Sequence, residues 1–489
     1  MPYLLNLLYL LLLLVASPWL IYYAWRKGKY REGYAEKVLG RVPVRPPERD
    51  GERRPCLWLH AVSVGEVNLL STLVRRIERA HPDWRCVIST TTRTGMELAR
   101  KRFPDRLVFY CPLDFSWAVG QAMRRIRPDV VVLTELELWP NLIRAAKRQG
   151  AAVAVINGRL SEKSFQGYRR VRHFLRGVLR QLDIVAAQDE AYAERFRQLG
   201  VPGERVAVTG SMKFDGVQTD RDNPQTRELI AVAGFARDDA IFLAGSTQDP
   251  EERVALNVWR RLSTEFPHLR LVIVPRHPER FDEVARLLDR AGVAWHRRSE
   301  LTDSLGAAHN SPASVATASG SVGVSASRGA AVRGSAGASA SPGDSEGKPG
   351  VANRRSDDPS PGSGPRSPDI LLVDTVGELG AWWGTARIAY VGGSMGSRGG
   401  QNMIEPAAYG AAVSFGPNTR NFRDIVAALL RRDAAVVVAD ERELEQFVRR
   451  CLTEPAWAGE LGDRARCLVA EQQGATGRTV ELLARLVSP

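Results

Sequence analysis

The sequence has few of the residues that build metal sites and disulfide frameworks. Its 489 residues include five cysteines and seven histidines. The cysteines are scattered, with Cys451 and Cys467 the nearest two, and no Cys-x-x-Cys pair occurs. No two histidines have the spacing of a metal site on a helix. We therefore expect no disulfide framework, no zinc ribbon and no structural metal, and we expect a reducing compartment.

Several signatures of nucleotide and RNA binding are also missing. Gly-Lys-Ser/Thr does not occur, which excludes a Walker loop, and no clean Gly-x-Gly-x-x-Gly follows the first expected strand, which disfavours a nicotinamide dehydrogenase. The aromatic-rich RNP motif of RNA-binding domains is absent too. Lys and Arg nevertheless outnumber Asp and Glu by 68 to 55, a net charge of +13. Such a charge predicts an anionic partner: nucleic acid, phospholipid headgroups or a phosphorylated substrate.

Charge is absent from Pro2 to Trp25, and most of this segment is apolar. A membrane-spanning helix needs about 20 such residues. The basic residues Arg26 and Lys27 follow the run, so the positive-inside rule predicts a cytoplasmic body. Because only Met-Pro-Tyr precedes the run, we expect an uncleaved single-pass anchor rather than a signal peptide. A shallow interfacial helix is the alternative, since Asn6 and Pro18 weaken the span.

Aromatic residues are absent between Trp295 and Trp382. Within this gap, residues 302–368 are mostly Ser, Ala, Gly and Pro. This composition buries too little apolar surface to fold, so it predicts a disordered insert in a folded domain. The composition breaks divide the chain into an anchor and two domains, expected at residues 1–30, 31–220 and 221–489.

Short apolar runs alternate with amphipathic stretches in both domains. The runs predicted as buried strands are Cys56–His60, Arg85–Ser89, Arg106–Tyr110, Asp129–Leu133, Ala151–Ile156, Asp183–Ala186, Arg205–Val208, Ala240–Ala244, Arg270–Val274, Ile370–Val373, Arg387–Val391, Ala411–Phe415 and Ala434–Val438. Asn68–Ala80 and Phe115–Ile126 have helical spacing. This alternation predicts an α/β protein with parallel, doubly wound sheets. Ligands of such sheets lie at the carboxyl ends of the strands, and two such domains place a cleft between them.

Acidic residues follow two of these strands. Ser63 and Glu66 have the spacing of a capping box, and the helix dipole also favours a glutamate at this position. Capping therefore explains Glu66 without catalysis, and a catalytic role is the alternative. Glu135 and Glu137 point the same way if the fourth strand continues through them. Two such carboxylates need a cation or a substrate hydroxyl nearby, unless they are simply solvated.

Cationic residues follow other strands. Lys213 comes after a strand and a glycine turn, where it either holds an anion or is solvated. Arg276 and Arg280 follow a later strand, and their planar guanidinium groups suit phosphate or carboxylate, with a basic surface turn as the alternative. The glycine-rich segment Tyr390–Ala408 exposes backbone N–H groups, and the helix expected after Asn402 offers its positive end to phosphate.

Seven motifs then occur together in a fixed order. They are His60-Ala-Val-Ser-Val-Gly-Glu66, Glu137-Leu-Trp-Pro-Asn141, Gly210-Ser-Met-Lys-Phe-Asp215, Ala244-Gly-Ser-Thr247, Pro275-Arg-His-Pro-Glu-Arg280, Asp374-Thr-Val-Gly-Glu-Leu379 and Gly400-Gln-Asn-Met-Ile-Glu-Pro-Ala-Ala408. In this combination the chain resembles the 3-deoxy-D-manno-octulosonic acid (Kdo) transferases of lipopolysaccharide biosynthesis. The resemblance implies a GT-B glycosyltransferase with two Rossmann-like domains. It implies transfer of Kdo from CMP-Kdo to a lipid A precursor at the inner leaflet of the inner membrane, without a metal ion or other cofactor.

The resemblance also implies roles for individual residues. It makes Glu66 the general base that deprotonates the acceptor hydroxyl, and a single displacement then inverts the anomeric centre. It assigns stabilisation of the transition state to a carboxylate of Glu135 or Glu137 together with Lys213. The residues that it implies for binding of CMP-Kdo are Ser246, Pro275, Arg276, Val376, Gly377, Glu378, Asn402, Met403, Ile404 and Glu405. Cations and a helix N-terminus suit the departure of an anionic nucleotide.

Two departures from the family pattern limit these assignments. Gln248 and Gln401 stand where many members have histidine, so neither receives a proton-transfer role, and the long insert has no counterpart. Other functions stay open: a GT-B enzyme that uses a UDP-sugar, a membrane-tethered RNA-binding protein, or a scaffold without catalysis. The expected partners are CMP-Kdo, a lipid A precursor and the membrane, with no nucleic acid.

Overall fold

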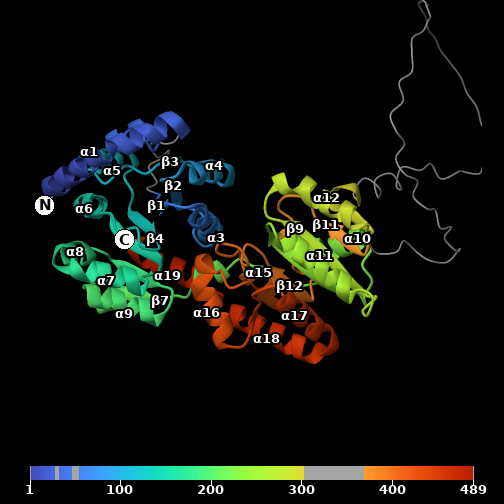
Figure 1. Cartoon of the computed structure of the whole chain (residues 1–489). Coiled ribbons are helices and arrows are strands. Elements are labelled where there is room, and N and C mark those ends of the chain that lie inside the picture. The colour runs from blue at the N-terminus through green and yellow to red at the C-terminus, as the bar shows by residue number, and fades with distance from the viewer. Residues whose placement is uncertain (1, 28–31, 47–53, 302–367, 488–489) are drawn as a thin grey trace, which may run out of the picture. The chain divides into compact units, whose positions relative to one another are not determined.

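The computed structural model describes residues 2–27, 32–46, 54–301 and 368–487 (Figure 1). Nearly all of the insert expected at residues 302–368 lies outside the described residues. The chain divides into two compact units, which we call unit 1 (Met1–Arg221 with Arg387–Pro489) and unit 2 (Asp222–Ala386). The domain bounds expected from the sequence stay a prediction.

Unit 1 holds a parallel sheet with seven described strands in the order β3-β2-β1-β4-β5-β6-β7. The strands are β1 (Cys56–Ala61), β2 (Arg85–Thr90), β3 (Val108–Tyr110), β4 (Val130–Thr134), β5 (Ala152–Gly158), β6 (Ile184–Ala187) and β7 (Val206–Val208). Every residue of the central strands β1 and β4 is buried, because their apolar runs face helices on both sides of the sheet. The strand order is that of a Rossmann fold, with its switch point between β1 and β4.

Helices connect these strands. They are α2 (Tyr34–Leu39), α3 (Val64–Ala80), α4 (Arg93–Arg102), α5 (Ser116–Ile126), α6 (Pro140–Arg148), α7 (Glu162–Arg170), α8 (Arg172–Leu179) and α9 (Glu190–Leu199), with short 3-10 turns η1 (Gly203–Arg205) and η2 (Met212–Phe214). Several begin at a side chain that accepts a hydrogen bond from the first turn: Ser63 for α3, Thr92 for α4 and Asp189 for α9. These helix starts lie at the carboxyl ends of β1, β2 and β6.

The C-terminal segment returns to the first sheet. Its elements are β12 (Ile388–Val391), α15 (Ile404–Ala408), β13 (Ala412–Phe415), η4 (Arg420–Phe422), α16 (Arg423–Arg431), β14 (Val436–Val437), α17 (Glu441–Thr453), α18 (Pro455–Gln472) and α19 (Ala475–Val487). The last helix, α19, packs against α3, β5 and β6, and in Figure 1 it lies beside that sheet. The last helix of the chain therefore belongs to the same compact unit as the first sheet.

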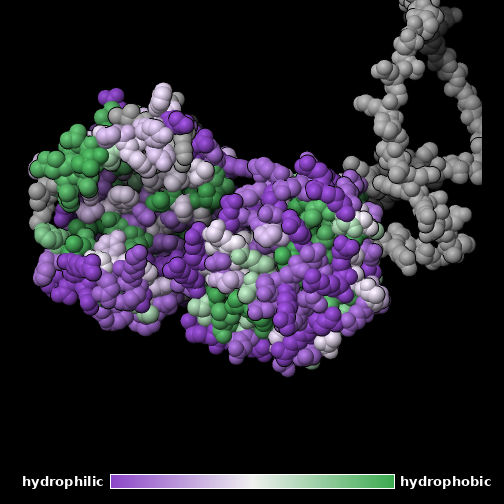
Figure 2. All heavy atoms as spheres, in the orientation of Figure 1, coloured by the Kyte–Doolittle hydropathy of each residue, from purple (hydrophilic) through white to green (hydrophobic). Residues whose placement is uncertain are grey.

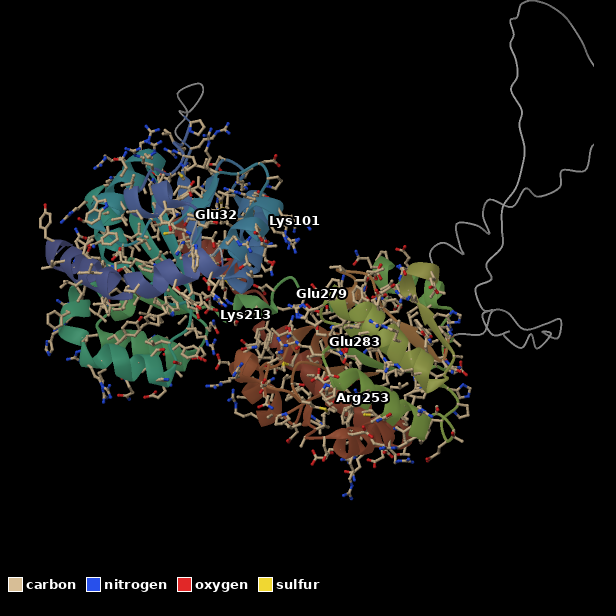
Figure 3. All side chains as sticks on the ribbon, turned by 45° about the horizontal axis from the view of Figure 1, so that its top comes forward. Glu32, Lys101, Lys213, Arg253, Glu279 and Glu283 are labelled. Carbon is tan, nitrogen blue, oxygen red and sulfur yellow. The ribbon has the colours of Figure 1, made fainter. Side chains whose placement is uncertain are left out.

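Unit 2 contains four described parallel strands of the second sheet, in the order β10-β11-β9-β8, and unit 1 contains three more, in the order β12-β13-β14. The unit 2 elements are α10 (Pro224–Ala233), β8 (Ala240–Thr247), α11 (Glu251–Leu262), β9 (Leu269–Pro275), η3 (Pro278–Arg280), α12 (Phe281–Ala291), β10 (Trp295–Arg297), β11 (Ile370–Leu372) and α14 (Leu379–Trp382). Arg253, Glu279 and Glu283, which are labelled in Figure 3, are exposed on this unit. Two parallel, Rossmann-like sheets confirm the predicted α/β fold class.

The N-terminal helix α1 (Pro2–Lys27) packs against α5. Its buried Asn6 donates to Ser116 Oγ over 2.7 Å and accepts from the Ser116 backbone N–H over 3.0 Å, and the Tyr9 hydroxyl donates to Asp114 over 3.1 Å. In the described part of the chain, no helix has the length and apolar character that crossing a membrane requires. The spanning anchor expected at residues 1–30 is therefore not supported, and α1 carries polar side chains that bond to the body.

Candidate active site

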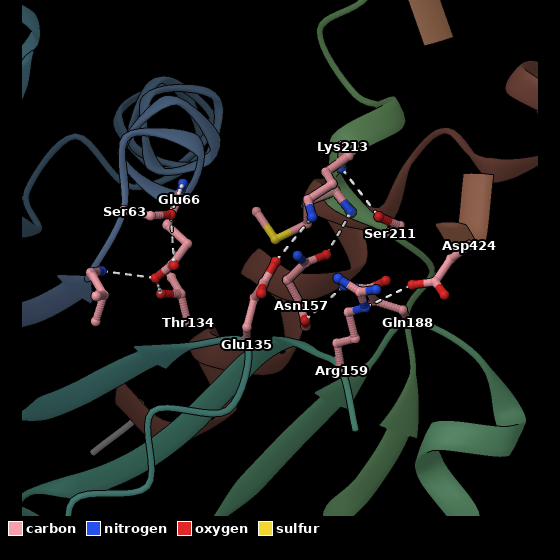
Figure 4. Close-up of polar contacts among 12 residues, drawn as sticks. Ser63, Glu66, Thr134, Glu135, Asn157, Arg159, Gln188, Ser211, Lys213 and Asp424 are labelled. Carbon is pink, nitrogen blue, oxygen red and sulfur yellow. Dashed lines mark hydrogen bonds and ion pairs between the residues drawn. The ribbon is translucent and has the colours of Figure 1, made fainter. Parts of the chain in front are cut away.

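Glu66 lies in the first turn of α3, beyond the carboxyl end of β1. Its amide N–H donates to Ser63 Oγ over 3.3 Å, which confirms the predicted capping box. One carboxylate oxygen accepts from Ser63 Oγ over 2.8 Å, and the other accepts from the Val62 N–H over 2.8 Å and lies 2.6 Å from Thr134 Oγ1 (Figure 4). These contacts fix the carboxylate at the sheet edge, and they suit either a cap or a fixed base.

Thr134, the last residue of β4, has one hydroxyl proton and two acceptors. Its Oγ1 lies 2.9 Å from the His60 carbonyl oxygen and 2.6 Å from Glu66. The His60 ring lies inside the sheet, where burial lowers its pKa to about 4 and Nδ1 lies 2.9 Å from Ser89 Oγ. His60 is therefore neutral at physiological pH, and Thr134 links its backbone to the Glu66 carboxylate.

The condition for Glu135 and Glu137 to point the same way, a fourth strand that continues through them, is not met, because β4 ends at Thr134. The backbone turns at Glu135, whose φ of +54° lies in the left-handed region that non-glycine residues rarely adopt. Glu135 Oε1 pairs with Lys213 Nζ at 3.0 Å, so the cation that two such carboxylates need is present for one of them. The structure thus shows the Glu135–Lys213 ion pair, while the catalytic role of the pair stays a prediction.

Glu137 is the other carboxyl group of this cluster. Burial raises its pKa to about 7, the negative charges of Glu66 and Glu135 add to this effect, and a hydrogen bond with Trp139 opposes it. Near neutral pH the side chain is thus divided between its protonated and ionised forms. The structure places Glu137 close enough to Glu66 for the two carboxyl groups to influence each other.

Lys213 lies in η2, on a turn that two other segments hold in place. Asp215 accepts backbone hydrogen bonds from Gly474 and Thr476 at the start of α19, and Arg478 Nε donates to the Thr209 carbonyl over 2.8 Å. The C-terminal helix therefore fixes the outer side of the turn. The structure brings Glu66, Glu135, Glu137 and Lys213 together in unit 1, at the carboxyl ends of β1, β4 and β7.

A pocket of about 360 Å³ opens beside Lys213 in unit 1, and most of its lining residues were not predicted from the sequence. Arg159, which follows β5, pairs through Nε with Asp424 of α16 at 2.7 Å, and both line the pocket with Tyr192. Burial acts to lower the pKa of Arg159, but the Tyr192 hydroxyl and Asp424 together raise it above its ordinary value. Arg159 and Asp424 are far apart in the sequence, so no local pattern could pair them.

Six residues expected to bind the donor lie in unit 2. Ser246 is buried near the end of β8 with a φ of +55°, and Pro275 ends β9. The Arg276 N–H donates to the Thr247 carbonyl over 3.0 Å, and among the described residues its exposed guanidinium has no ion pair. Arg280, in contrast, is paired with the buried Glu252 at 3.1 Å. Of the two arginines, Arg276 is thus the one free to meet an anion.

Glu378, at the start of α14, is already engaged. The Arg298 guanidinium donates to both of its carboxylate oxygens over 3.1 and 3.2 Å, and Thr375 Oγ1 and Trp382 Nε1 donate over 2.7 and 3.1 Å. Val376 is 79% exposed, and Gly377 has a φ of +99°. The carboxylate of Glu378 therefore holds its own loop together, while Val376 and Gly377 are exposed.

The remaining four donor residues, Asn402 to Glu405, lie in unit 1 at the start of α15. Asn402 Nδ2 donates to Glu405 Oε1 over 2.9 Å, and Asn402 Oδ1 accepts from the Ile404 N–H over 3.1 Å, while Met403 is buried. The helix expected after Asn402 is confirmed. Across the described ranges, no group of three or more His, Cys, Asp or Glu side chains could hold a metal ion, and the metal-free reaction stays a prediction.

Comparison with known proteins identifies the family. Residues 34–216 match the family model of 3-deoxy-D-manno-octulosonic-acid transferase (kdotransferase). The chain is 30% identical to the 3-deoxy-D-manno-octulosonic acid transferase of Bordetella pertussis over 97% of this chain and 98% of that protein, and 28% identical to that of Haemophilus influenzae over 97% of each. Among solved structures, UDP-GlcNAc 2-epimerase from Neisseria meningitidis, bound to UDP-GlcNAc, matches with a TM-score of 0.52 and 12% identity. The match covers 88% of this chain and 100% of that chain, and it shows a shared fold alone. Given two full-length matches, the chain belongs to the 3-deoxy-D-manno-octulosonic acid transferase family.

Proposed function

We propose that the protein transfers Kdo from CMP-Kdo to a lipid A precursor, in the biosynthesis of the lipopolysaccharide core. Family membership supports the reaction type. The observation that carries the proposal is the placement of Glu66 beside the Glu135–Lys213 pair, at the carboxyl edge of the first sheet. A fixed carboxylate and a fixed ammonium group at one edge are what a displacement between a sugar hydroxyl and an anionic leaving group needs.

In this proposal Glu66 is the general base. The Val62 N–H and the Ser63 and Thr134 hydroxyls orient its carboxylate toward the sheet edge. Glu66 takes the proton of the acceptor hydroxyl while the acceptor oxygen forms its bond to the anomeric carbon of Kdo. The bond between that carbon and the phosphate oxygen of CMP breaks, and its electron pair leaves with CMP. A single displacement of this kind inverts the anomeric centre.

Lys213 stabilises the negative charge that develops during the displacement, and Glu135 holds the ammonium group in place at 3.0 Å. For binding of the leaving nucleotide we propose two groups of residues. The residues of unit 2 are Ser246, Pro275, Arg276, Val376, Gly377 and the loop-forming Glu378, and those of unit 1 are Asn402 to Glu405. The free guanidinium of Arg276 supports its assignment to an anion. The proposal includes no metal ion and no other cofactor.

We also propose that unit 1 binds the cytoplasmic face of the inner membrane. On α1, Leu14 and Val15 are 69% and 80% exposed, and Figure 2 shows apolar surface over its N-terminal half. The corner of α7 and α8, residues 169–180, carries five arginines and no acidic residue, and its Phe174 is 71% exposed. Exposed apolar side chains among arginines suit a surface of anionic headgroups.

An environment-sensitive fluorophore tests this membrane face. A Cys467→Ser background removes the exposed cysteine and leaves four buried ones. A label on Phe174→Cys should shift its emission to the blue on vesicles that contain phosphatidylglycerol. A label on Arg253→Cys, on unit 2, is the control and should not shift. Vesicle binding without any change at position 174 would assign the membrane contact to another surface.

Mass spectrometry tests the reaction itself. The purified protein, a lipid A precursor and CMP-Kdo should give a product heavier by one or more Kdo units, with release of CMP. A panel of UDP- and GDP-sugars separates this donor from those of other GT-B enzymes, because only CMP-Kdo should be consumed. Transfer from a UDP-sugar would replace the proposal. Salt-dependent RNA binding without sugar transfer would favour the RNA-binding alternative.

A further inference from the structure

Two left-handed residues that are not glycine lie at the carboxyl ends of two neighbouring strands of the first sheet. Glu135 follows β4 with a φ of +54°, and Asn157 lies at the end of β5 with a φ of +50°. The strands are parallel neighbours, and the Glu135 N–H donates to the Ile156 carbonyl over 2.9 Å. This backbone conformation is unfavourable for residues with a Cβ atom, and it persists where surrounding structure enforces it.

Asn157 is fully buried, and its side chain holds the turn that carries Lys213. Asn157 Oδ1 accepts from the Met212 N–H over 3.0 Å, and Met212 directly precedes Lys213. The Asn157 carbonyl accepts from Gln188 Nε2 over 3.0 Å. The Lys213 turn is therefore bonded to the sheet through Asn157 on one side and to α19 through Asp215 on the other.

The second atom of the Asn157 amide faces the same charged pair. Within the described residues, Asn157 Nδ2 has no hydrogen-bond partner although it is buried. In Figure 4 the Asn157 side chain lies between Glu135 and the Lys213 turn. A buried donor without a partner is costly. Its presence at the carboxyl edge of the sheet, beside the proposed catalytic residues, points to a role beyond holding the Lys213 turn.

Glycine would satisfy the backbone at position 157 more easily, because it adopts positive φ without a Cβ clash. The Asn157 side chain therefore contributes contacts that the left-handed backbone at position 157 does not itself require. We propose that Asn157 is a positioning residue for the reaction, which fixes the Glu135–Lys213 pair by holding the Met212 N–H and by presenting its amide to Glu135. The inference rests on the proposed role of Lys213 in transfer.

The main test is Asn157→Gly, which removes the side chain and relieves the backbone at once. We expect an unchanged or higher melting temperature, a kcat about 10- to 100-fold lower, and KM values for both substrates within about threefold, since small displacements of a charged group near the reacting atoms cost rate. Asp433→Gly is the matched control, because Asp433 also has a positive φ, +47°, but is exposed and follows α16, away from the Lys213 turn. It should leave kcat unchanged.

Asn157→Asp separates the two amide atoms. It keeps an oxygen for the Met212 N–H, but it replaces the donor with a second oxygen beside Glu135. We expect a lower kcat that recovers in part at acid pH, where one of the two carboxyl groups takes a proton. A kcat that is unchanged at every pH would overturn the role of the Nδ2 group.

A double-mutant cycle distinguishes failure of this inference from failure of the proposed function. Lys213→Met alone should lose transfer; if it does not, the proposed role of Lys213 is wrong. If Asn157 acts through Lys213, adding Asn157→Gly to Lys213→Met should cause no further loss of kcat. Losses that multiply, or a normal kcat in Asn157→Gly while Lys213→Met is inactive, would overturn the positioning role.

Discussion

Substituting Glu66 with glutamine separates the capping role of this residue from its proposed role as the base. The amide oxygen of glutamine can still accept from the Val62 N–H, which lies 2.8 Å from the carboxylate. The same amide oxygen can accept from Thr134 Oγ1, 2.6 Å away in the wild type, and the amide nitrogen, in the place of the other carboxylate oxygen, can donate to Ser63 Oγ at 2.8 Å. The hydrogen bonds of the capping box are thus all replaceable.

The expected loss of stability is small. Glutamine gives up the interaction of a negative charge with the positive end of α3, which is worth about 0.3–1 kcal/mol at an exposed helix start. We expect the free energy of unfolding to fall by no more than about 1 kcal/mol. CMP affinity should be unchanged, because the residues proposed to bind the nucleotide lie elsewhere.

The expected loss of rate is much larger. An amide cannot take the proton of the acceptor hydroxyl, and loss of general-base catalysis slows turnover by about 10²–10⁴-fold. Such a loss corresponds to about 3–5 kcal/mol of transition-state stabilisation. The two effects therefore differ enough to be measured separately in one variant.

The assay follows Kdo transfer to the lipid acceptor at saturating substrates, with thermal unfolding and CMP titration on the same preparation. Ser63→Ala is the matched control, since it removes the cap but leaves the Glu66 carboxylate. It should lose about 1 kcal/mol of stability and only a few-fold in rate. Turnover within about threefold of wild type in Glu66→Gln would return this residue to a purely structural role.

Four further outcomes are expected. The pKa of Glu137 is raised from 4.5 to about 7, so its contribution to stability is present below pH 4.5 and is lost as the pH rises through 7. Over that range, urea unfolding should show the free energy of unfolding of the wild type falling by about 1 kcal/mol relative to that of Glu137→Gln. Arg298→Met should destabilise the protein by about 3 kcal/mol in thermal unfolding and weaken CMP binding in titration, because it leaves the Glu378 carboxylate without its cation. Deleting residues 304–367 should change the melting temperature little, since loop closure costs only about 0.6 kcal/mol per doubling of length; a large loss of stability or turnover would show that the insert packs. Removing residues 1–25 should reduce sedimentation with membranes but spare transfer to a detergent-solubilised acceptor, and full sedimentation after a salt wash would contradict this.

The strands could be predicted because each is a local apolar run. The fully buried β1 and β4 read as continuous apolar stretches, and their expected positions agree with the structure to within one residue at each end. β10, at Trp295–Arg297, escaped prediction. It is a three-residue edge strand of Trp, His and Arg. It is a strand because it pairs with β11, which follows the insert in the sequence.

The candidate site was predictable only where chemistry follows a strand directly. Glu66 and its cap lie within four residues of each other, so spacing alone shows their contact. Glu378 was assigned to donor binding through the family resemblance alone, and that role stays a prediction; its partner Arg298, which donates to both of its oxygens, lies 80 positions away in sequence. Contacts of this separation depend on the path of the chain and leave no local pattern.

The alternation of strands and helices, the capping box at Glu66 and the family could be predicted from the sequence, because these depend on local periodicity and on the order of motifs. Two contacts of the site depend instead on the three-dimensional fold: Glu135, in a left-handed conformation after β4, pairs with Lys213, and Asn157 holds the Lys213 turn. Parallel strands place their carboxyl ends at one edge, so residues up to 78 positions apart meet there. Side-chain partners at that edge follow from the three-dimensional register of the strands, which no single segment contains.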